Sequence, residues 1–335
     1  MLCKGHSKME VGDTKGYICW SKNNNARANS TSGAVFYELA VECLSKNGVV
    51  YGAVFDDYFE VVHNRGTNTF DICHMQGSKY SQSKLGDTYC RVKFDLENGI
   101  KVLFTGTPCQ VAGLKNYLGK EYDNLLSLDF ICLGVPSPKV WKDYLVAFHE
   151  ISKIERITFK DKRFGWSRWT FLVKSSDRVF RQPGSINYFM QAYLKHLVIR
   201  PSCYKCPFRT VHHTSDFTVA DCWGIDKVAP ELNDEKGIST LLVHTEKGED
   251  YLLEIEERLN RIKKSVSDLL SENPYATNPI AINQARSNFF VMYKKSGIIK
   301  ALKKYARRRN LLKLWKEEFR WKHISLNEFN EGSEL

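Results

Sequence analysis

The chain has 335 residues, of which 43% are hydrophobic and 26% charged, which excludes a disordered protein and allows a sizeable buried core. It lacks a run of about 18 apolar residues, which excludes a transmembrane helix. Its start, MLCKGHSKMEVGD, lacks the apolar middle of a signal peptide, so we expect a cytoplasmic protein. The net charge of +11 comes mostly from residues 294–323, which hold twelve Lys and Arg against two Glu.

The first 150 residues alternate between helical and strand patterns. The expected elements are a helix at 31–48, strands at 48–55 and 99–106, a helix at 107–119, a strand at 124–134 and a helix at 137–150. Pro108 and Pro138 each follow a hydroxyl residue, as is common where helices begin. This order predicts an α/β fold whose mixed sheet contains parallel strands with flanking helices.

The pattern changes from about residue 151 onward. The expected elements are a β-hairpin from 156–166 and 168–176, a helix at 186–199, strands at 215–225 and 237–245, and a helix at 249–265. We therefore divide the chain into an N-terminal α/β part (1–150), a smaller β-rich insertion carrying a cysteine pair (151–250) and a helical, basic C-terminal extension (251–335).

Four of the ten cysteines are placed where they could meet. In a reducing compartment, clustered thiols more often bind metal or do redox chemistry than form disulfides. Cys109 falls in the first turn of a helix that follows a strand, where free N–H groups are expected to lower the thiol pKa. Cys132 ends the next strand, so both can reach the same edge of a parallel sheet. Cys203 and Cys206 form a separate CxxC pair.

Four thiolates suit either Zn(II) or an iron–sulfur cluster. Only one pair is a zinc-type knuckle, and the step from Cys206 to Pro207 is familiar from ferredoxin loops, so the residues favour iron–sulfur. A disulfide, a thiol–disulfide enzyme using Cys203 and Cys206, and plain buried thiols stay open. Cys222 is ambiguous because it lies in a strand close to the pair. The remaining cysteines are interpreted as ordinary side chains: Cys3, Cys19, Cys43, Cys73 and Cys90.

Several motifs occur in a fixed order along the chain. They are STSGAVFYELA, GSKYSQSKLGDTY, GTPCQVAGLKNYL, LDFICLGVPSPKVW, CYKCPF, SDFTVADCWG and KGIST. Together they resemble the family of coenzyme F420 hydrogenase/dehydrogenase beta subunits over about residues 17–245. The resemblance implies a flavin-dependent oxidoreductase that binds FAD and a 4Fe-4S cluster, with Cys109, Cys132, Cys203 and Cys206 as the cluster ligands.

The resemblance also implies partners. Electrons would pass between a hydride carrier, such as F420H2 or NAD(P)H, or a reduced ferredoxin, and one-electron acceptors. The acceptors include a redox partner protein, and the chain would work as an oligomer or as part of a complex. Some bacterial relatives belong to cell-surface polysaccharide pathways, so a sugar-linked role is one hypothesis.

The chain departs from the family pattern in three places. Cys3 and Cys19 are too sparse for the N-terminal ferredoxin module that many bacterial members carry. The chain has Cys132-Leu133-Gly134 where the family often has Cys-His-Gly, so Leu133 replaces a histidine that could have a proton role. Cys222 stands where GDFWG is usual, which raises the hypothesis of a fifth thiol near the cluster.

Two segments offer small hydroxyl and cationic residues that suit FAD. The first precedes a helix, whose N-terminus favours anions, and supplies Arg27, Ser30, Thr31, Ser32 and Gly33. The second supplies Ser78, Lys79, Gln82 and Ser83. Without a ligand, the first is an N-cap cluster and the second a polar surface loop; the resemblance assigns both to flavin. No GxGxxG fingerprint is present, so a Rossmann-type grip is not supported.

No Ser/His/Asp or paired-carboxylate arrangement predicts a catalytic side chain, as expected where cofactors carry the chemistry. His212 and His213 lie near the cysteine pair and are expected to be ordinary polar residues. The alternative function is a partner-binding module without catalysis, stabilised by zinc on the four cysteines.

Residues 298–323 form a basic amphipathic pattern. Its apolar positions are Ile298, Leu302, Tyr305, Leu312, Trp315 and Phe319. Three hypotheses fit: peripheral contact with an anionic membrane through 294–323, docking of an acidic partner, or the solvated face of a packed helix. No recognition motif supports binding of nucleic acid.

Overall fold

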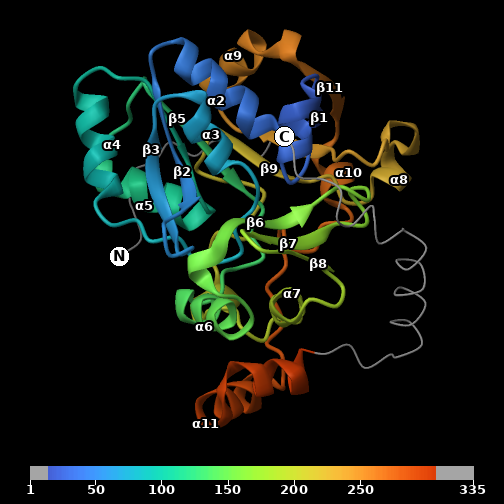
Figure 1. The fold of residues 1–335 in the computed structure, drawn as a ribbon. Coiled ribbons are helices and arrows are strands. Elements are labelled where there is room, and N and C mark those ends of the chain that lie inside the picture. Colours follow the sequence, from blue (N-terminus) through green and yellow to red (C-terminus); the bar gives the residue numbers. More distant parts are fainter. Residues whose placement is uncertain (1–13, 307–335) are drawn as a thin grey trace.

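The computed structural model describes residues 14–306, which form two sheets surrounded by helices (Figure 1). The strands are β1 (Lys15–Ser21), β2 (Val49–Phe55), β3 (Val61–Gly66), β4 (Val102–Thr105), β5 (Leu125–Phe130), β6 (Ile154–Asp161), β7 (Thr170–Ser175), β8 (Val179–Pro183), β9 (Phe217–Asp221), β10 (Ser239–Val243) and β11 (Leu259–Lys264). The α-helices are α1 (Asn24–Asn29), α2 (Val35–Ser45), α3 (Thr69–Met75), α4 (Thr88–Glu97), α5 (Pro108–Leu118), α6 (Pro138–Phe148), α7 (Tyr188–Leu194), α8 (Ile225–Val228), α9 (Glu246–Glu254), α10 (Val266–Leu270) and α11 (Arg286–Tyr305).

The larger sheet has eight strands in the order β11-β1-β10-β9-β5-β4-β2-β3. Its central strands β2, β4, β5 and β9 are parallel. The outer strands pair antiparallel on both sides. The predicted α/β class, with a mixed sheet, parallel strands, a smaller sheet and a C-terminal helix, is confirmed.

Helices cover both faces of the larger sheet. On one face, Leu39 of α2, Ile72 of α3 and Leu252 of α9 join the strand residues in one core. On the other face, Val92 of α4 and Leu114 of α5 do the same. Parallel strands need such two-sided burial because both of their faces are apolar. With both faces covered, the parallel strands remain accessible at their carboxyl ends.

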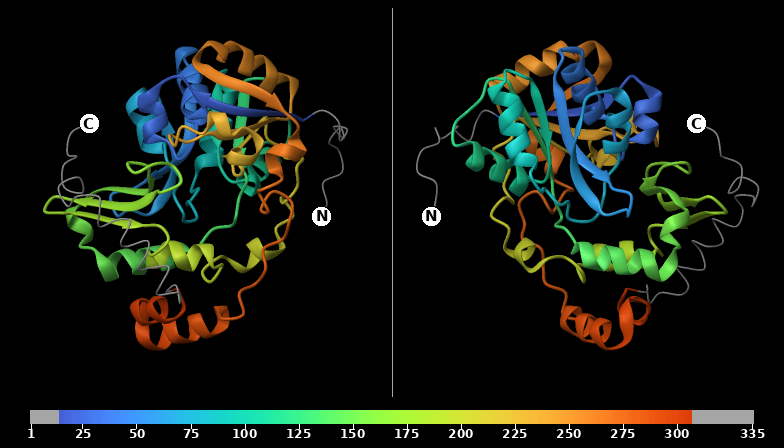
Figure 2. Two further views of the ribbon diagram at one scale, coloured as in Figure 1. Left: turned by 90° about the vertical axis from the view of Figure 1, so that its right-hand side faces the viewer. Right: turned by 60° about the vertical axis from the view of Figure 1, so that its left-hand side comes forward.

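A second layer lies below the larger sheet in Figure 2 and consists of β6, β7, β8, α6, α7 and α11. Its core is aromatic. Trp141 of α6 is fully buried, and its ring lies 4.9 Å from the rings of Phe159 and Phe189, measured between centroids. α11 packs against α6 and α7 on the side away from the larger sheet (Figure 2).

The helix predicted at 249–265 is wrong in its second half. This stretch is α9 followed by β11, which pairs with β1 from Gly16↔Lys264 to Ser21↔Leu259. Pairing satisfies the backbone of β1 along its outer edge, and this long-range gain overrides the local helical pattern. The larger sheet thus takes strands from each of the three segments 1–150, 151–250 and 251–335.

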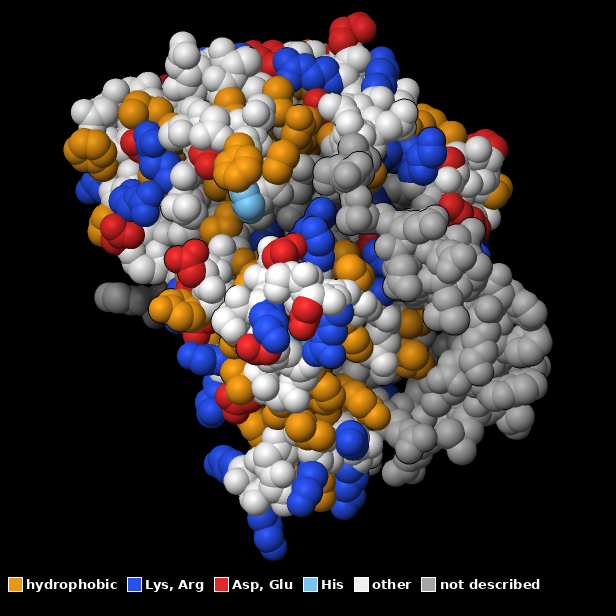
Figure 3. All heavy atoms as spheres, viewed as in Figure 1, with side chains coloured by type: hydrophobic (Ala, Val, Ile, Leu, Met, Phe, Trp, Pro, Cys, Tyr) orange, Lys and Arg blue, Asp and Glu red, His pale blue; other side chains and the backbone are white. Residues whose placement is uncertain are grey.

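The basic segment 294–323 lies partly in α11 and partly outside the described residues. Within α11, Ile298 and Leu302 are buried against the second layer, so this apolar face is used inside the protein. The Lys side chains of α11 are exposed on its outer side: Lys294, Lys295, Lys300, Lys303 and Lys304. Figure 3 shows cationic side chains gathered over this end of the molecule. Up to Tyr305 the segment is therefore a packed helix with a charged outer face.

Among residues 14–306, no helix combines the length and the apolar character needed to cross a membrane.

Candidate functional site

A cavity of about 820 Å³ opens at the carboxyl ends of β4, β5 and β9. The loops that follow parallel strands meet at one edge of a sheet, which is where ligands collect in α/β folds. Thr105, Phe130 and Asp221 mark the three strand ends in its wall. Lys160 of β6 and Tyr193 of α7 close it from the second layer. The cavity thus lies between the two layers of the molecule.

All four cysteines of the predicted set line this cavity. Cys109 lies in the first turn of α5, where Thr107 and Gln110 form a capping box and Thr107 Oγ1 lies 3.1 Å from Cys109 Sγ. Cys132 follows β5, and its Sγ accepts a hydrogen bond of 3.3 Å from the Gly134 N–H. The other two cysteines lie in and directly after a short 3₁₀ helix, Pro201–Lys205.

Gly134 allows the loop after β5 to touch the loop of the CxxC pair. Its φ is +120°, a conformation that favours glycine, and an added Cβ would lie 2.8 Å from Ile199 Cγ2 and 3.0 Å from Cys203 Cβ. A backbone hydrogen bond from Arg200 N to Val135 O, 3.0 Å long, joins the same two loops. Cys132 and Cys203 are therefore neighbours although they are far apart in the sequence.

The thiols are less acidic than the sequence predicted. Burial raises the pKa of Cys109, and it outweighs the Thr107 hydrogen bond that lowers this pKa. Burial raises the pKa of Cys132 to about 12, although the Gly134 N–H and the charge of Arg209 lower it. Electrostatic repulsion from Cys203 adds to the rise of the pKa at both thiols. The expectation that the helix start would lower the pKa of Cys109 is therefore wrong.

Within residues 14–306, no group of three Cys, His, Asp or Glu side chains is tight enough to hold a single metal ion. The four thiols line a common space instead of converging on one point. All nine cysteines in this part of the chain are free thiols.

The residues predicted at the first flavin segment divide into two groups. Ser30, Thr31 and Ser32 line the cavity. Arg27 is buried and turned away from it, because its guanidinium donates to both carboxylate oxygens of Asp234, at 2.6 and 2.7 Å, and to Gly237 O.

Gly33 is likewise outside the cavity wall described by the structure. An added Cβ there would lie 2.4 Å from Cys19 O and 2.9 Å from Ser239 N. The lack of a side chain at Gly33 thus lets the segment lie against β1 and β10.

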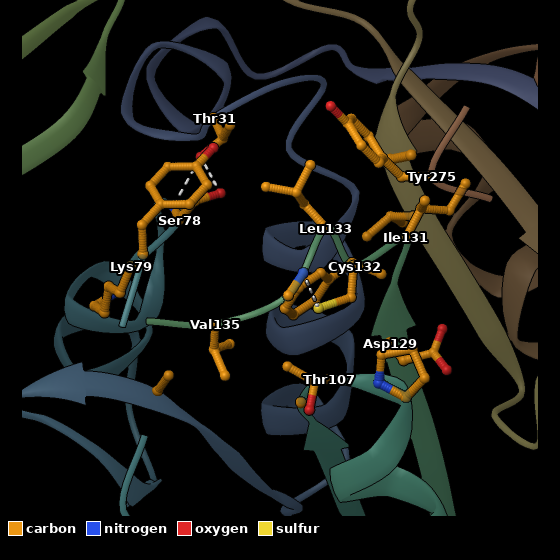
Figure 4. A pocket seen from close by; sticks show the side chains of 18 of the residues that line it. Thr31, Ser78, Lys79, Thr107, Asp129, Ile131, Cys132, Leu133, Val135 and Tyr275 are labelled. Carbon is orange, nitrogen blue, oxygen red and sulfur yellow. Dashed lines mark hydrogen bonds between the residues drawn. The ribbon is translucent and has the colours of Figure 1, made fainter. Parts of the chain in front are cut away.

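All four residues predicted at the second segment line the cavity: Ser78, Lys79, Gln82 and Ser83. Ser78 N donates to Thr31 Oγ1 at 2.8 Å, and the Thr31 hydroxyl donates to Ser78 Oγ at 2.9 Å, which joins the two predicted segments (Figure 4). In that view Thr31, Ser78 and Lys79 lie on one side of the cavity, and Cys132 and Asp129 on the other.

Lys79 also stabilises the end of α3. Its Nζ donates to the carbonyls of Met75, Gln76 and Gly77 at 3.1 to 3.2 Å. Burial lowers the pKa of Lys79 to about 7. Its three donors are thus used within the protein, and what it can offer a ligand is positive charge.

The structure adds wall residues that the sequence did not single out. His63 Nε2 donates to Thr105 O at 2.8 Å, and its buried Nδ1 has no hydrogen-bond partner among residues 14–306. Burial lowers the pKa of His63 to about 4, so the ring is neutral. Among residues 14–306, the buried Ser81 Oγ also lacks a hydrogen-bond partner, and so does Oε1 of Gln82, a residue that the sequence did predict. The polar run around Ser81 was a signal for that residue, whereas nothing in the sequence indicated His63.

A buried ion pair lines the cavity as well. Lys160 of β6 bonds Asp221 at the end of β9, and both side chains are 12% exposed. Burial disfavours the charge on Lys160, but Asp221 and Tyr80 outweigh it and raise the pKa. The pair therefore joins the two layers across the cavity. Asp221 lies inside the strand predicted at 215–225 and ends the observed β9. An earlier end of the predicted strand, at this acidic residue, was the signal that could have found it.

Cys222 points away from the cavity. It is 1% exposed and belongs to an apolar cluster with Ile18, Ile225 and Leu269. The hypothesis of a fifth thiol near the four is therefore wrong, because successive strand residues face opposite sides. Cys19 and Cys43 are buried, and Cys73 and Cys90 are exposed. Cys3 lies outside the described residues.

A family model matches residues 99–266, and it describes the C-terminal part of the beta subunit of coenzyme F420 hydrogenase/dehydrogenase. This stretch is half of the chain and includes all four cavity cysteines, so the chain falls in a class of redox-enzyme subunits. It belongs to the coenzyme F420 hydrogenase/dehydrogenase beta subunit family.

A solved structure shares the fold. It is the xenon-derivatized F420-reducing [NiFe] hydrogenase complex from Methanosarcina barkeri, one chain of which superposes with a TM-score of 0.50 at 14% sequence identity. The superposition covers 86% of this chain and 89% of that chain. No curated protein matches.

Proposed function

We propose that the chain is an iron–sulfur flavoprotein that passes electrons between a hydride carrier and one-electron acceptors. FAD, when bound, exchanges hydride, and a 4Fe-4S cluster, when bound, exchanges single electrons. The observation that supports the proposal is that one cavity has four thiols and a set of polar residues in its wall. The redox role of the family agrees with it. A partner protein would receive or supply the single electrons.

The residues on the cysteine side fit an iron–sulfur cluster. Four thiols are the donor set that such clusters take, and Gly134 keeps the loops of Cys132 and Cys203 in contact. The charge of Arg209 acts on Cys132, and its Nη2 donates to Leu133 O at 2.7 Å. Arg209 would therefore hold the loop after β5 and favour the thiolate that a metal requires.

The residues on the opposite side fit a flavin. A cavity of about 820 Å³ is in the range of sites for large organic ligands. Three buried atoms have no hydrogen-bond partner within the described part of the chain: His63 Nδ1, Ser81 Oγ and Gln82 Oε1. Each such atom costs about 1–3 kcal/mol unless a ligand satisfies it. A flavin ring edge carries both N–H donors and carbonyl acceptors, so it can supply these bonds.

Three features of the chain would then orient and protect the cofactor. Ser30, Thr31 and Ser78 offer hydroxyl groups for its polar chain. Burial lowers the pKa of Lys79 to about 7, so an anionic phosphate or ring beside it would favour its charged form. The aromatic side chains of Tyr80 and Tyr193, whose rings lie 4.9 Å apart between centroids, form part of an apolar wall that excludes water.

Anaerobic purification tests the proposal. We expect visible absorption from flavin and cluster, with iron and sulfide in equal amounts and FAD bound to the same protein. In Cys203→Ser the iron should be lost, because the remaining thiols cannot complete the set. Cys90→Ser is the matched control, since Cys90 is exposed and lies on α4 outside the cavity, and it should keep its iron.

The alternatives give different results. Colourless protein with bound zinc would support the partner-binding module instead, and colourless protein without metal would leave a thiol–disulfide enzyme. Unchanged iron in Cys203→Ser would reject the ligand set.

A further inference from the structure

A buried chain of hydrogen bonds begins at the cavity wall and runs into the larger sheet. Asp129 of β5 is fully buried, and both of its carboxylate oxygens lie 2.8 Å from His213 Nδ1. Thr218 Oγ1 lies 2.6 Å from Asp129 Oδ1 and 2.9 Å from His244 Nε2. His244 Nδ1 lies 3.2 Å from Thr14 Oγ1. The chain reaches from the carboxyl end of β5 to the start of β1.

The positions of the protons follow from what each group can donate. A carboxylate only accepts, so His213 Nδ1 donates to Asp129 and the Thr218 hydroxyl does the same. Thr218 then accepts from His244 Nε2–H, and the Nδ1 of His244 accepts from the Thr14 hydroxyl. Burial lowers the pKa of His244 to about 3, so this ring stays neutral. Every bond in the chain is then satisfied.

This arrangement leaves His213 Nε2 free to accept a proton. Its Nδ1 carries the proton given to Asp129, so Nε2 carries a lone pair, and within the described residues no hydrogen bond to Nε2 is present. His213 and Asp129 both line the cavity. A histidine whose one nitrogen is fixed by a carboxylate and whose other nitrogen is free is arranged to take up and return a proton.

We propose that His213 accepts and donates the proton of the redox reaction in the cavity, with Asp129 and Thr218 as positioning residues. This inference rests on the proposed function, because it assigns to one side chain a proton that the proposed electron transfer must release. Leu133, which also lines the cavity, has no group that can ionise.

The atoms and charges of the step balance. A hydride consists of one proton and two electrons. When the two electrons pass to two one-electron acceptors, the proton remains. His213 Nε2 then binds this proton through its lone pair, and the bond between the proton and the hydride carrier's reduced partner breaks. The imidazolium formed is held by the Asp129 carboxylate, and the proton then passes to solvent. In the opposite direction His213 gives the proton back.

Other titratable groups surround the two rings without competing for this proton. The His213 and His244 rings are stacked, with centroids 5.8 Å apart, and His244 stays neutral. On the segment of His213 itself, Asp216 accepts from Ser127 on the neighbouring strand, and His212 is exposed. Asp129 is therefore the charge that acts most directly on His213.

Stopped-flow reoxidation of the dithionite-reduced holoprotein by ferricyanide tests the inference across the neutral pH range. We expect His213→Gln to slow reoxidation by roughly 100-fold, the size of a general acid–base contribution, and to remove its pH dependence. Asp129→Asn should move the apparent ionisation to lower pH, because the imidazolium loses its counter-charge. His212→Gln is the matched control and should behave as the wild type.

A second measurement does not depend on turnover. Nitrogen NMR of histidine-labelled wild-type protein should show a His213 ring that carries its proton on Nδ1 and has a bare Nε2. A bare Nδ1, or wild-type kinetics in a His213→Gln protein that retains its iron and flavin, would overturn the inference. Wild-type protein without flavin and iron would reject the proposed function itself, so the two failures are distinguishable.

Discussion

The two sides of the cavity are built in different ways. The cysteine side consists of the loops that follow β4 and β5 and of the loop of the CxxC pair, which touches the loop after β5 at Gly134. The side that we propose for the flavin, called the flavin side below, consists of the loop after α3 and the segment before α2, which are joined by the hydrogen bonds of Thr31 and Ser78. On the cysteine side, the thiol groups themselves would bind the metal. On the flavin side, groups such as Thr31, Ser78 and Lys79 already make hydrogen bonds within the protein.

This difference indicates what each side can tolerate. Thiols that must share one metal centre need fixed positions, so the cysteine side depends on close backbone contact. A large organic ligand makes many weak contacts, so the loss of one residue on the flavin side is diluted among the others. Changes on the cysteine side should therefore have the larger effects.

The largest effect is expected for Gly134→Ala. Alanine would be strained at φ +120°, and its Cβ would meet Ile199 and Cys203 at 2.8 and 3.0 Å. We expect the free energy of unfolding to fall by about 3 kcal/mol, and iron to be lost as the two loops separate. Chemical denaturation and iron analysis measure both.

Gly86→Ala is the matched control. Its φ is also positive, at +52°, but no atom lies within 4 Å of an added Cβ. It should cost only about 1 kcal/mol and leave the iron content unchanged. Equal losses in the two variants would show that backbone strain alone, and not the contact between the loops, explains the result.

The cysteine side was the more predictable from sequence. Cys109 and Cys132 follow recognisable parallel strands, and the rule that such strands end at one edge placed them together. Nothing in the sequence showed that Cys203 would meet Cys132, because that contact depends on Gly134 and on the bridge between Pro136 and Ile199. The sequence analysis grouped the CxxC pair with Cys109 and Cys132 as a candidate set, and the family resemblance implied the same set, but neither predicted this contact.

The flavin side was less predictable for a physical reason. Ser, Lys and Arg residues in polar loops look alike in sequence whether they serve a ligand or the protein. Arg27 is of a residue type that often binds phosphate, yet its N–H groups donate to Asp234 and Gly237. The same ambiguity hid His213, since its partner Asp129 comes from a strand 84 positions away. Long-range pairing decides these roles.

A smaller effect is expected for Lys79→Met. The variant removes a positive charge from the flavin side, so FAD should bind about 10-fold more weakly, as expected for one charged contact, while iron stays bound. Fluorescence titration of FAD into deflavinated protein measures the affinity. Loss of iron along with the flavin would contradict the separation of the two sides.

The same variant should change how stability depends on pH. The pKa of Lys79 is lowered to about 7 in the folded protein, from about 10.4 in an unfolded chain. Between these values the unfolded chain binds more protons, so the wild type gains stability as the pH rises through this window. Lys79→Met lacks this gain, and its stability relative to the wild type should fall with rising pH. Lys84→Met, at an exposed lysine paired with Glu60, is the control and should show no such trend near pH 8.

The smallest effect is expected for Cys222→Ala. Cys222 directly follows β9 and is buried in an apolar cluster outside the cavity. The thiol fills apolar space beside Ile18 and Leu269, so its removal should cost about 1 kcal/mol of unfolding free energy. Cys222→Ser should cost more, since it places a hydroxyl in the same apolar cluster. Neither should alter iron content or the visible spectrum. A spectral change in both variants, with stability preserved, would mean that the thiol acts on the cysteine side, and the division of faces described here would have to be redrawn.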